Sequence, residues 1–485
     1  MSRWLSAQTV RQSLQSHSAL GLALAALLYL ICLTGTLTVF HADFERWEQP
    51  DVPERLEFSA VQLSRALDAT LARLPQIPET LYLILPTADM PRLHVHAADD
   101  EWLVTADGAL GDAVTAPWSS LVNALHVRLQ LPETVGGIVV GIMGVMLGAL
   151  LLSGILAHPG VFRDAFAWRS GATGRLFHVD LHNRLGVWGL PFALMIALTG
   201  AFMGLAAVFG GGYAAAYLHN DRQAVFDMVY GPDIEVTEAN VPPADFGRAL
   251  ATLKQRVPTA QPIYIALQHP RTPRQYVEIA AALPGRLVFS EIYRFSSGGD
   301  YINHQALADG PAGRQVAYSV YRLHFGHFGG WPVQFGYGLL GLGLTVLCAS
   351  GVNIYLAKRR EQTVLNGLWA AWVWGWPAAL AAAAAGALHG VAPGLVLAVG
   401  TVLALALGCS VRDADRLRSA LLAALCAMLV AIVCSHFARY GGEITDNAAS
   451  LSMNGALAVG AVVSAILAYR AAGRARATAA PVSQS

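Results

Sequence analysis

The sequence predicts an α-helical integral membrane protein, built as a pseudo-twofold four-helix bundle with two periplasmic α+β modules and four additional C-terminal transmembrane helices. Three observations lead to this fold class. Of the 485 residues, 55% are hydrophobic and only 13% are charged, about half the charged fraction of a soluble protein. The apolar residues gather in runs of about 20, the length of helix that crosses a hydrocarbon core of about 30 Å. The segment 12–360 also repeats itself internally.

Eight apolar runs have the length and composition of transmembrane helices. We expect the first run to be retained as a span, because it is too long for a signal peptide and lacks a small-residue cleavage site. The eight spans are expected at 18–40, 136–157, 185–209, 335–356, 368–388, 393–409, 417–437 and 451–469.

The distribution of basic residues predicts the orientation. Connections on one side carry lysine and arginine, for example Arg163 and Lys358, whereas the loop 387–392 on the other side carries none. Because basic loops stay in the cytoplasm, we expect both termini to be cytoplasmic in a bacterial inner membrane. The long segments 42–125 and 210–325 are then periplasmic.

A duplication accounts for the first four spans. The first and third spans match at a constant offset of 165 residues, and the second and fourth at 197 or 198. Both copies enter the membrane in the same direction, which predicts a pseudo-twofold axis along the membrane normal. The matched positions are His17 and His182, Gly21 and Gly186, Gly35 and Gly200, His126 and His324, Ser153 and Ser350, and Gly154 and Gly351.

The repeat sets the predicted domain boundaries. Each copy is a span, an external α+β module and a second span, and the four C-terminal spans have no counterpart in the repeat. We interpret these last four as an accessory bundle that faces lipid or a partner. The segments are 1–41 (N-terminal segment and first span), 42–120 (first module), 121–209 (second and third spans), 210–318 (second module), 319–360 (fourth span) and 361–485 (extension).

Histidines at the ends of the first four spans are the candidate functional residues, since an ionisable side chain at a span edge is costly and usually functional. The duplication should place His17 opposite His182 near the inner surface, and His126 opposite His324 near the outer surface. Two imidazoles on facing bundle helices are what bis-histidine heme ligation requires. The sequence therefore predicts two b-type hemes, one at each end of the bundle.

Two further histidines are reserve ligands. His158 shares a helix face with Gly154 and is an alternative to His17, although its repeat counterpart is Tyr355. His327 lies three residues after His324 and is an alternative to it.

Other chemistry is less well supported. A zinc site at His94-x-His96 lacks an evident partner ligand. The five cysteines fall in the spans and form no Cys-x-x-Cys pair or covalent heme motif, so we interpret them as packing residues. A net charge of zero implies no nucleic-acid partner, only lipid around the spans.

These motifs together resemble the PepSY-associated transmembrane family, and within it the iron-regulated inner-membrane siderophore reductases of the ferrioxamine type. The resemblance covers about residues 12–360. It rests on the paired positions above and on three local motifs, which are Ser153-Gly154-Ile155-Leu156-Ala157-His158, Asp180-Leu181-His182-Asn183 and Leu323-His324-Phe325-Gly326.

The resemblance implies two periplasmic PepSY modules, two b-type hemes and an oxidoreductase that reduces a ferric siderophore from Fe(III) to Fe(II). No dinucleotide-binding motif opens a cytoplasmic helix, so a quinol or a cytoplasmic reductase is required as electron donor. One alternative is a non-enzymatic PepSY sensor or assembly protein that binds periplasmic peptides or proteins. A second is a transporter, which the scarcity of charged residues in the first four spans disfavours.

Overall fold

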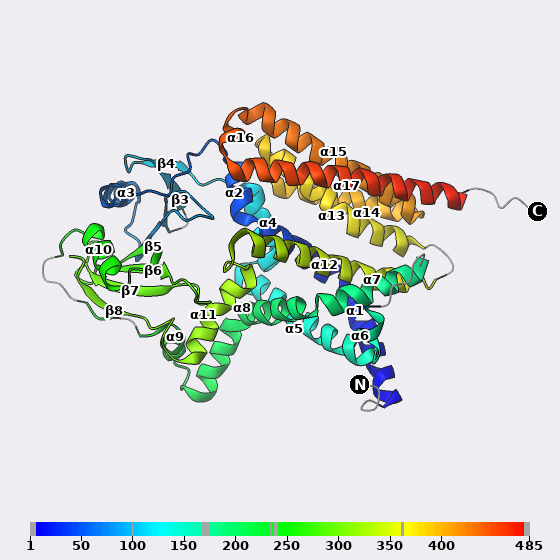
Figure 1. The fold of residues 1–485 in the computed structure, drawn as a ribbon, viewed down its shortest axis with the longest axis horizontal. Coiled ribbons are helices and arrows are strands. Elements are labelled where there is room, and N and C mark those ends of the chain that lie inside the picture. Colours follow the sequence, from blue (N-terminus) through cyan, green and yellow to red (C-terminus); the bar gives the residue numbers. More distant parts are fainter. Residues whose placement is uncertain are drawn as a thin grey trace, which may run out of the picture. The chain divides into compact units, whose positions relative to one another are not determined.

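The computed structural model describes residues 6–98, 100–166, 174–232, 234–236, 241–359 and 363–479 (Figure 1). It divides into two compact units. The helical unit comprises Met1–Asp51, Ala116–Leu205 and Trp331–Ser485, and the α+β unit comprises Val52–Thr115 and Ala206–Gly330. The predicted boundary at residue 361 lies outside the described residues.

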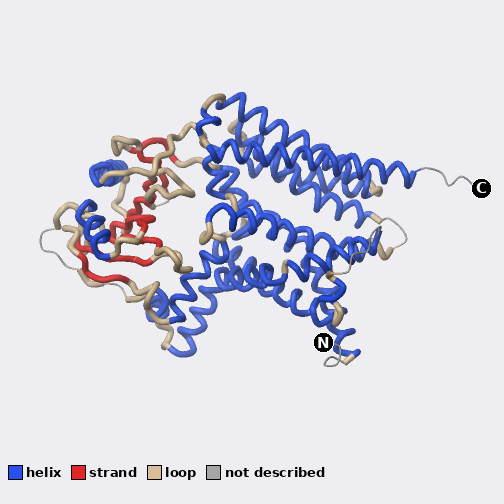
Figure 2. Tube along the Cα trace, viewed as in Figure 1, coloured by secondary structure: helices blue, strands red, loops and turns tan. Residues whose placement is uncertain are grey.

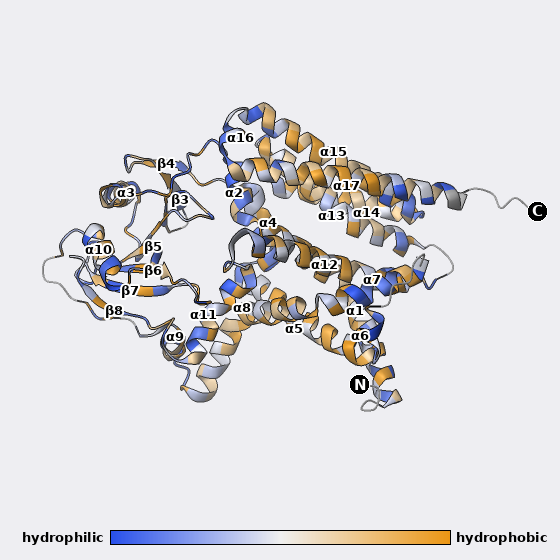
Figure 3. Cartoon of the chain, viewed as in Figure 1, coloured by the Kyte–Doolittle hydropathy of each residue, from blue (hydrophilic) through white to orange (hydrophobic). Residues whose placement is uncertain are grey.

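Eight of the described helices are long and apolar enough to cross a membrane, the number that the sequence predicts, so the chain is a multi-pass membrane protein. Figure 3 shows the apolar residues that run along these helices. They are α1 (Ala7–Thr38), α5 (Glu133–Ala157), α8 (Leu190–Tyr217), α12 (Gly330–Leu356), α13 (Val364–Leu388), α14 (Pro393–Ser410), α15 (Ala414–Tyr440) and α17 (Ala448–Ala479).

Short helices complete the helical unit: α2 (His41–Glu48), α4 (Pro117–Arg128), α6 (Val161–Asp164), α7 (Gly174–Trp188) and α16 (Glu443–Asp446). Side-chain caps fix several helix starts, because the first backbone N–H groups of a helix have no partner within it. Ser6 accepts from the N–H of Thr9 at the start of α1, and Asp413 accepts from Asp415 and Arg416 at the start of α15.

One buried apolar cluster takes side chains from α1, α5, α8 and α12, the four spans of the repeat. Small residues bring α5 and α8 close together, since a Cβ on Gly144 would lie 2.9 Å from the backbone of Ala201. The buried members of the cluster are Leu28, Ile31, Met143, Leu147, Leu150, Leu151, Ala193, Ala197, Leu344 and Leu347.

The described strands all belong to the α+β unit (Figure 2). They form one eight-stranded antiparallel sheet in the order β4-β3-β2-β1-β5-β6-β7-β8. The strands are β1 (Thr80–Ile84), β2 (His94–Ala97), β3 (Asp100–Val104), β4 (Leu110–Ala113), β5 (Gln261–Gln268), β6 (Tyr276–Ala282), β7 (Glu291–Ser296) and β8 (Tyr301–His304). The sequence predicts two separate α+β modules, and the structure joins their strands edge to edge in one sheet.

The joining ladder is itself symmetric. Tyr82 of β1 pairs with Ala266 of β5, and Ile84 of β1 pairs with Tyr264 of β5. Leu83 and Ile265 pair with each other at the centre. Since β1 and β5 are equivalent strands of the repeat, exchanging the two copies maps this ladder onto itself.

The helices of the α+β unit are α3 (Ala60–Arg73), α9 (Arg222–Tyr230), α10 (Phe246–Arg256) and α11 (Ala312–Phe325). Strand residues alternate between the two faces of the sheet. Leu81, Leu83, Ile265 and Leu267 therefore lie on one face, and they share a buried core with apolar residues of α3 and α10.

One of the C-terminal helices, α13, does not face only lipid or a partner. The apolar window of α13 is 61% buried, whereas no other span exceeds 39%. Indole N–H groups join α13 to two spans of the repeat, with Trp372 donating to the carbonyl of Ala26 on α1 at 3.1 Å and Trp369 to the side chain of Asn353 on α12 at 3.1 Å. Helix α13 is thus part of the interior of the helical unit.

Candidate functional site

Two histidines from equivalent positions of the repeat face each other inside the helical unit. His17 lies on α1 and His182 lies on α7. Their ring centroids are 6.1 Å apart, with an angle of 75° between the ring planes. The structure therefore brings together the two residues that the duplication predicts as the inner pair.

Hydrogen bonds define which nitrogen of His17 carries the proton. Its Nδ1 lies 3.0 Å from the carbonyl oxygen of Leu150 and 3.2 Å from the hydroxyl of Ser153, both on α5. A carbonyl can only accept, so Nδ1 is the protonated nitrogen and Nε2 carries the lone pair. An imidazole held in this way is prepared to bind a metal through Nε2.

The second copy repeats this arrangement around His182. Its Nδ1 lies 2.9 Å from the hydroxyl of Ser350 on α12, and that hydroxyl donates to the carbonyl of Leu347 at 2.8 Å. Because the hydroxyl proton is used by Leu347, the oxygen accepts from Nδ1–H. His182 is therefore in the same tautomer as His17. Leu347 and Ser350, which hold His182, lie 197 positions after Leu150 and Ser153, which hold His17.

Glycines provide the space in which these imidazoles lie. A Cβ on Gly154 would lie 3.1 Å from Cε1 of His17, and a Cβ on Gly351 would lie 3.4 Å from Cε1 of His182. Each ring thus packs against the backbone of a Ser-Gly pair, in which serine supplies the hydrogen bond and glycine supplies the room. The sequence shows the repeated Ser-Gly pair, but the hydroxyl's role in orienting a histidine is visible only in the structure.

His126, the first residue of the predicted outer pair, is held by the same chemistry on α4. Its Nδ1 lies 3.0 Å from the carbonyl oxygen of Ile31, so its Nε2 also carries the lone pair. Burial lowers the pKa of His126 and favours the neutral ring. A Cβ on Gly35 would lie only 2.6 Å from Cε1 of this ring. The absence of a side chain at Gly35 therefore makes room for the imidazole of His126.

His324, the predicted partner of His126, lies in the last turn of α11 in the α+β unit. Its ring is 5.5 Å from that of Phe325, in an edge-to-face arrangement. The two residues of the outer pair therefore belong to different units, and their pairing stays a prediction from the repeat.

The reserve histidines have other surroundings. His158 follows the end of α5, and its Nε2 lies 3.5 Å from Asp164. His327 follows the end of α11 and stacks on Phe325, with ring centroids 5.7 Å apart. In the α+β unit, His94 binds Glu101 through Nδ1 at 3.0 Å. Among the described residues, no group of three or more histidine, cysteine or acidic side chains gathers at one place.

Comparison with known proteins places the duplicated framework in a family. The family described as "PepSY-associated TM region" matches residues 14–358, which include both copies of the repeat. The chain belongs to this PepSY-associated family. A protein of Pseudomonas aeruginosa (strain PAO1), named "Uncharacterized protein PA4219", is 31% identical over 252 residues. The match covers 49% of this chain and 64% of that relative.

The inner pair of this PepSY-associated protein fits a metal held by two opposed imidazoles. Two metal–nitrogen bonds of about 2 Å on opposite sides of one ion, plus half a ring on each side, separate the ring centroids by roughly 6 Å. The observed 6.1 Å agrees with this separation. A donor set of two neutral histidines on facing helices is the one found in b-type heme proteins, in which four equatorial nitrogens come from the porphyrin.

Proposed function

We propose that this protein is a b-type cytochrome that carries electrons across the bacterial inner membrane to a periplasmic acceptor, a ferric siderophore. In this proposal His17 and His182 hold the inner heme, and His126 with His324 hold the outer one. The proposal takes the two sites to lie at opposite ends of a pseudo-twofold bundle, with both termini cytoplasmic and the two PepSY modules periplasmic. The pair of His17 and His182, with matching tautomers and 6.1 Å between their rings, carries the proposal.

The residues of the chain would fix the positions of the heme ligands and raise the basicity of their imidazoles. Bound between these histidines, a heme would supply one-electron transfer. Ser153 and Ser350 hold the Nδ1–H groups of the inner ligands, which fixes the ring orientation and raises the basicity of Nε2. The apolar cluster shared by the four repeat helices excludes water and so favours transfer between fixed groups over reaction with solvent.

The overall reaction takes one electron for each iron. A quinol, which loses two electrons and two protons as it becomes a quinone, would reduce two irons, and a cytoplasmic reductase would supply the electrons one at a time; each Fe(III) in a siderophore becomes Fe(II). Hard oxygen donors such as those of siderophores hold Fe(II) more weakly than Fe(III), so reduction releases the metal.

The test is heme content by pyridine hemochrome assay, together with reduced-minus-oxidised spectra, of protein produced with sufficient heme. We expect two hemes per chain, and loss of one in both His17→Ala and His182→Ala. His158→Ala is the matched control, because this histidine pairs with Asp164 and should leave heme content unchanged.

Two results would overturn the proposal or its ligand assignment. Protein with no heme under these conditions would favour the alternative of a PepSY sensor or assembly protein. Loss of one heme in His158→Ala, with none lost in His17→Ala, would replace His17 by His158 as the ligand.

A further inference from the structure

We propose that the C-terminal helices α13, α15 and α17 act as a support that positions His126, by holding the first turn of α4. This inference rests on the proposed function, because it assigns a role to the extension in placing one ligand of the outer heme. It concerns the helical unit alone, since all the residues that carry it belong to that unit.

The first turn of α4 is capped from another helix. Its N-cap residue, Ala116, has no side chain that can accept a hydrogen bond. The carboxylate of Glu48, the last residue of α2, accepts instead from the backbone N–H of Trp118 at 2.9 Å and of Ser119 at 2.8 Å. A carboxylate at this position also interacts favourably with the helix dipole. Glu48 is therefore the cap of the helix that carries His126.

The C-terminal helices hold the segment that contains Glu48. His436 of α15 stacks on Trp47, with ring centroids 4.7 Å apart and planes 13° apart, and its Nε2 donates to the carbonyl of Trp47 at 2.8 Å. Asn454 of α17 donates to Nδ1 of His436 at 3.0 Å and accepts from the Trp47 indole at 3.1 Å. Tyr440 donates to the carbonyl of Glu48 at 3.3 Å.

These side chains form a closed network with no water-exposed member at its centre. Trp47, His436 and Asn454 are all at least 97% buried, and every side-chain donor and acceptor used by the histidine is paired. A buried polar network that is fully satisfied favours one arrangement of its helices over others, because any shift leaves a polar group without a partner. The position of α2, and hence of Glu48, is therefore fixed by α15 and α17.

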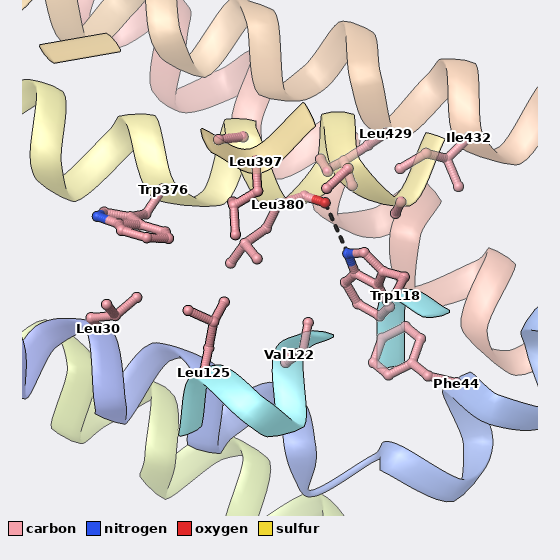
Figure 4. Close-up of a cluster of buried hydrophobic side chains, with 14 of the residues drawn as sticks. Leu30, Phe44, Trp118, Val122, Leu125, Trp376, Leu380, Leu397, Leu429 and Ile432 are labelled. Atoms are coloured by element: carbon pink, nitrogen blue, oxygen red, sulfur yellow. Dashed lines mark hydrogen bonds between the residues drawn. The ribbon is translucent and has the colours of Figure 1, made fainter. Parts of the chain in front are cut away.

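A second set of contacts fixes which face of α4 packs against the C-terminal helices. The indole of Trp118 donates to the carbonyl of Leu380 on α13 at 3.0 Å, as Figure 4 shows. Below it, Val122 and Leu125 face a cluster of apolar residues from α13, α14 and α15 (Figure 4). Helix α4 has only 12 residues, and a helix of this length depends on tertiary contacts for its stability.

The ligand lies on the same short helix. His126 follows Trp118 by eight residues and Val122 by one turn. A rotation or slide of α4 would therefore move the imidazole away from the carbonyl of Ile31 and from Gly35. His436 and Glu48 are thus positioning residues for His126, and they act without touching its ring.

The second copy of the repeat has no matching support in its sequence. At the offset of the two ligands, Trp118 corresponds to Val316 and Ser119 corresponds to Ala317. Val316 is 66% exposed within the α+β unit. The support therefore serves His126 and has no counterpart in the sequence before His324.

The test compares His436→Leu and Glu48→Leu with Ser419→Ala in full-length protein purified with heme. Ser419 also joins α15 to α17, by a hydrogen bond to Ala468, and it lies in the second turn of α15, 17 residues before His436. Heme transfer to apomyoglobin is measured together with the low-spin EPR signal of each heme. We expect one of the two hemes to dissociate about 10-fold faster with an altered EPR signal, as for loss of a supporting contact to a metal ligand. The other heme, and both hemes of Ser419→Ala, should be unchanged.

Glu48→Gln and Trp118→Phe keep the inference falsifiable if a leucine variant fails to fold. In Glu48→Gln the amide oxygen can still accept from one of the two N–H groups. We therefore expect its EPR signal to lie between those of Glu48→Leu and the unmodified protein. The inference is wrong if both hemes dissociate faster to the same extent, which indicates general destabilisation, or if neither heme changes. Absence of heme from the unmodified protein overturns the proposed function itself.

Discussion

Gly35→Ala is expected to weaken the site at His126 by displacing its ring. The added Cβ would lie 2.6 Å from Cε1 and 2.9 Å from Nδ1 of the imidazole, whereas ordinary contacts begin at 3.4 Å. The ring must therefore move by at least about 0.8 Å, which is 3.4 minus 2.6. A movement of this size along the 3.0 Å bond to Ile31 breaks it, at a cost of about 0.5–1.5 kcal/mol.

The helix itself should not suffer, since replacing glycine by alanine inside a helix stabilises it by about 1 kcal/mol. Gly21→Ala on the same helix is the matched control, because its Cβ would lie 3.9 Å from Leu150 and meet no closer side chain. We expect heme affinity at one site to fall about 10- to 100-fold in Gly35→Ala and to be unchanged in Gly21→Ala.

Heme dissociation kinetics and heme content of the two purified variants provide the assay. The reasoning is refuted if both variants lose heme at the same rate as the unmodified protein. It is also refuted if Gly21→Ala loses heme as readily as Gly35→Ala, because the effect would then come from the helix and not from the ring.

Three further predictions concern other parts of the chain. Ser350→Ala removes the acceptor of Nδ1–H on His182, so we expect about 10-fold weaker binding of one heme and a lower basicity of the ring, measured by heme titration and redox potentiometry. Arg294→Met removes the cation that lies 2.9 Å from the buried carboxylate of Glu278, and should destabilise the α+β unit by about 3–5 kcal/mol in denaturant unfolding. A hydrogen bond from His94 on the adjacent strand lowers the pKa of Glu101. The free energy that this carboxylate contributes to folding is therefore fully present above its ordinary pKa, and it is lost as pH falls through the lowered value. Thermal unfolding between pH 6 and pH 3 should show this loss in the unmodified protein, and a smaller loss when that histidine is replaced by glutamine.

The sequence predicts the inner pair well because two kinds of information agree there. Hydropathy locates the spans, and the offset of 165 residues makes His17 and His182 equivalent positions. A repeat with parallel spans leaves few ways to arrange two equivalent helices, so the facing histidines follow from the symmetry. The number of candidate spans follows equally directly from the length of the apolar runs.

The joining of the two modules could not be predicted in the same way. Each module has alternating strands, but pairing of β1 with β5 is a contact between residues about 180 positions apart. Nothing local specifies which strand edge of one module meets the other. The symmetric ladder becomes visible only when the register is known.

The role of the C-terminal helices was also hidden. Their sequences are rich in alanine and leucine, which suit lipid and helix interfaces equally. Several contacts that bind them to the first half, such as those of Trp118 and Trp372, end on backbone carbonyls, and backbone acceptors leave no mark in a sequence. One residue in the sequence indicates such a contact. Glu48 is an acidic residue just beyond the first span, and an acidic residue at this position rarely lacks a partner.

The self-complementary pairing of β1 with β5 has a consequence for the history of the chain. A half-length chain with one copy of the unit could form the same ladder with a second identical chain, since Leu83 and Ile265 would then be the same residue on a dyad. Joining two such genes would tether the subunits of a homodimer without altering their contact. Each copy could afterwards acquire different neighbours, as the first has with its C-terminal helices, while the shared ladder kept the ancestral geometry.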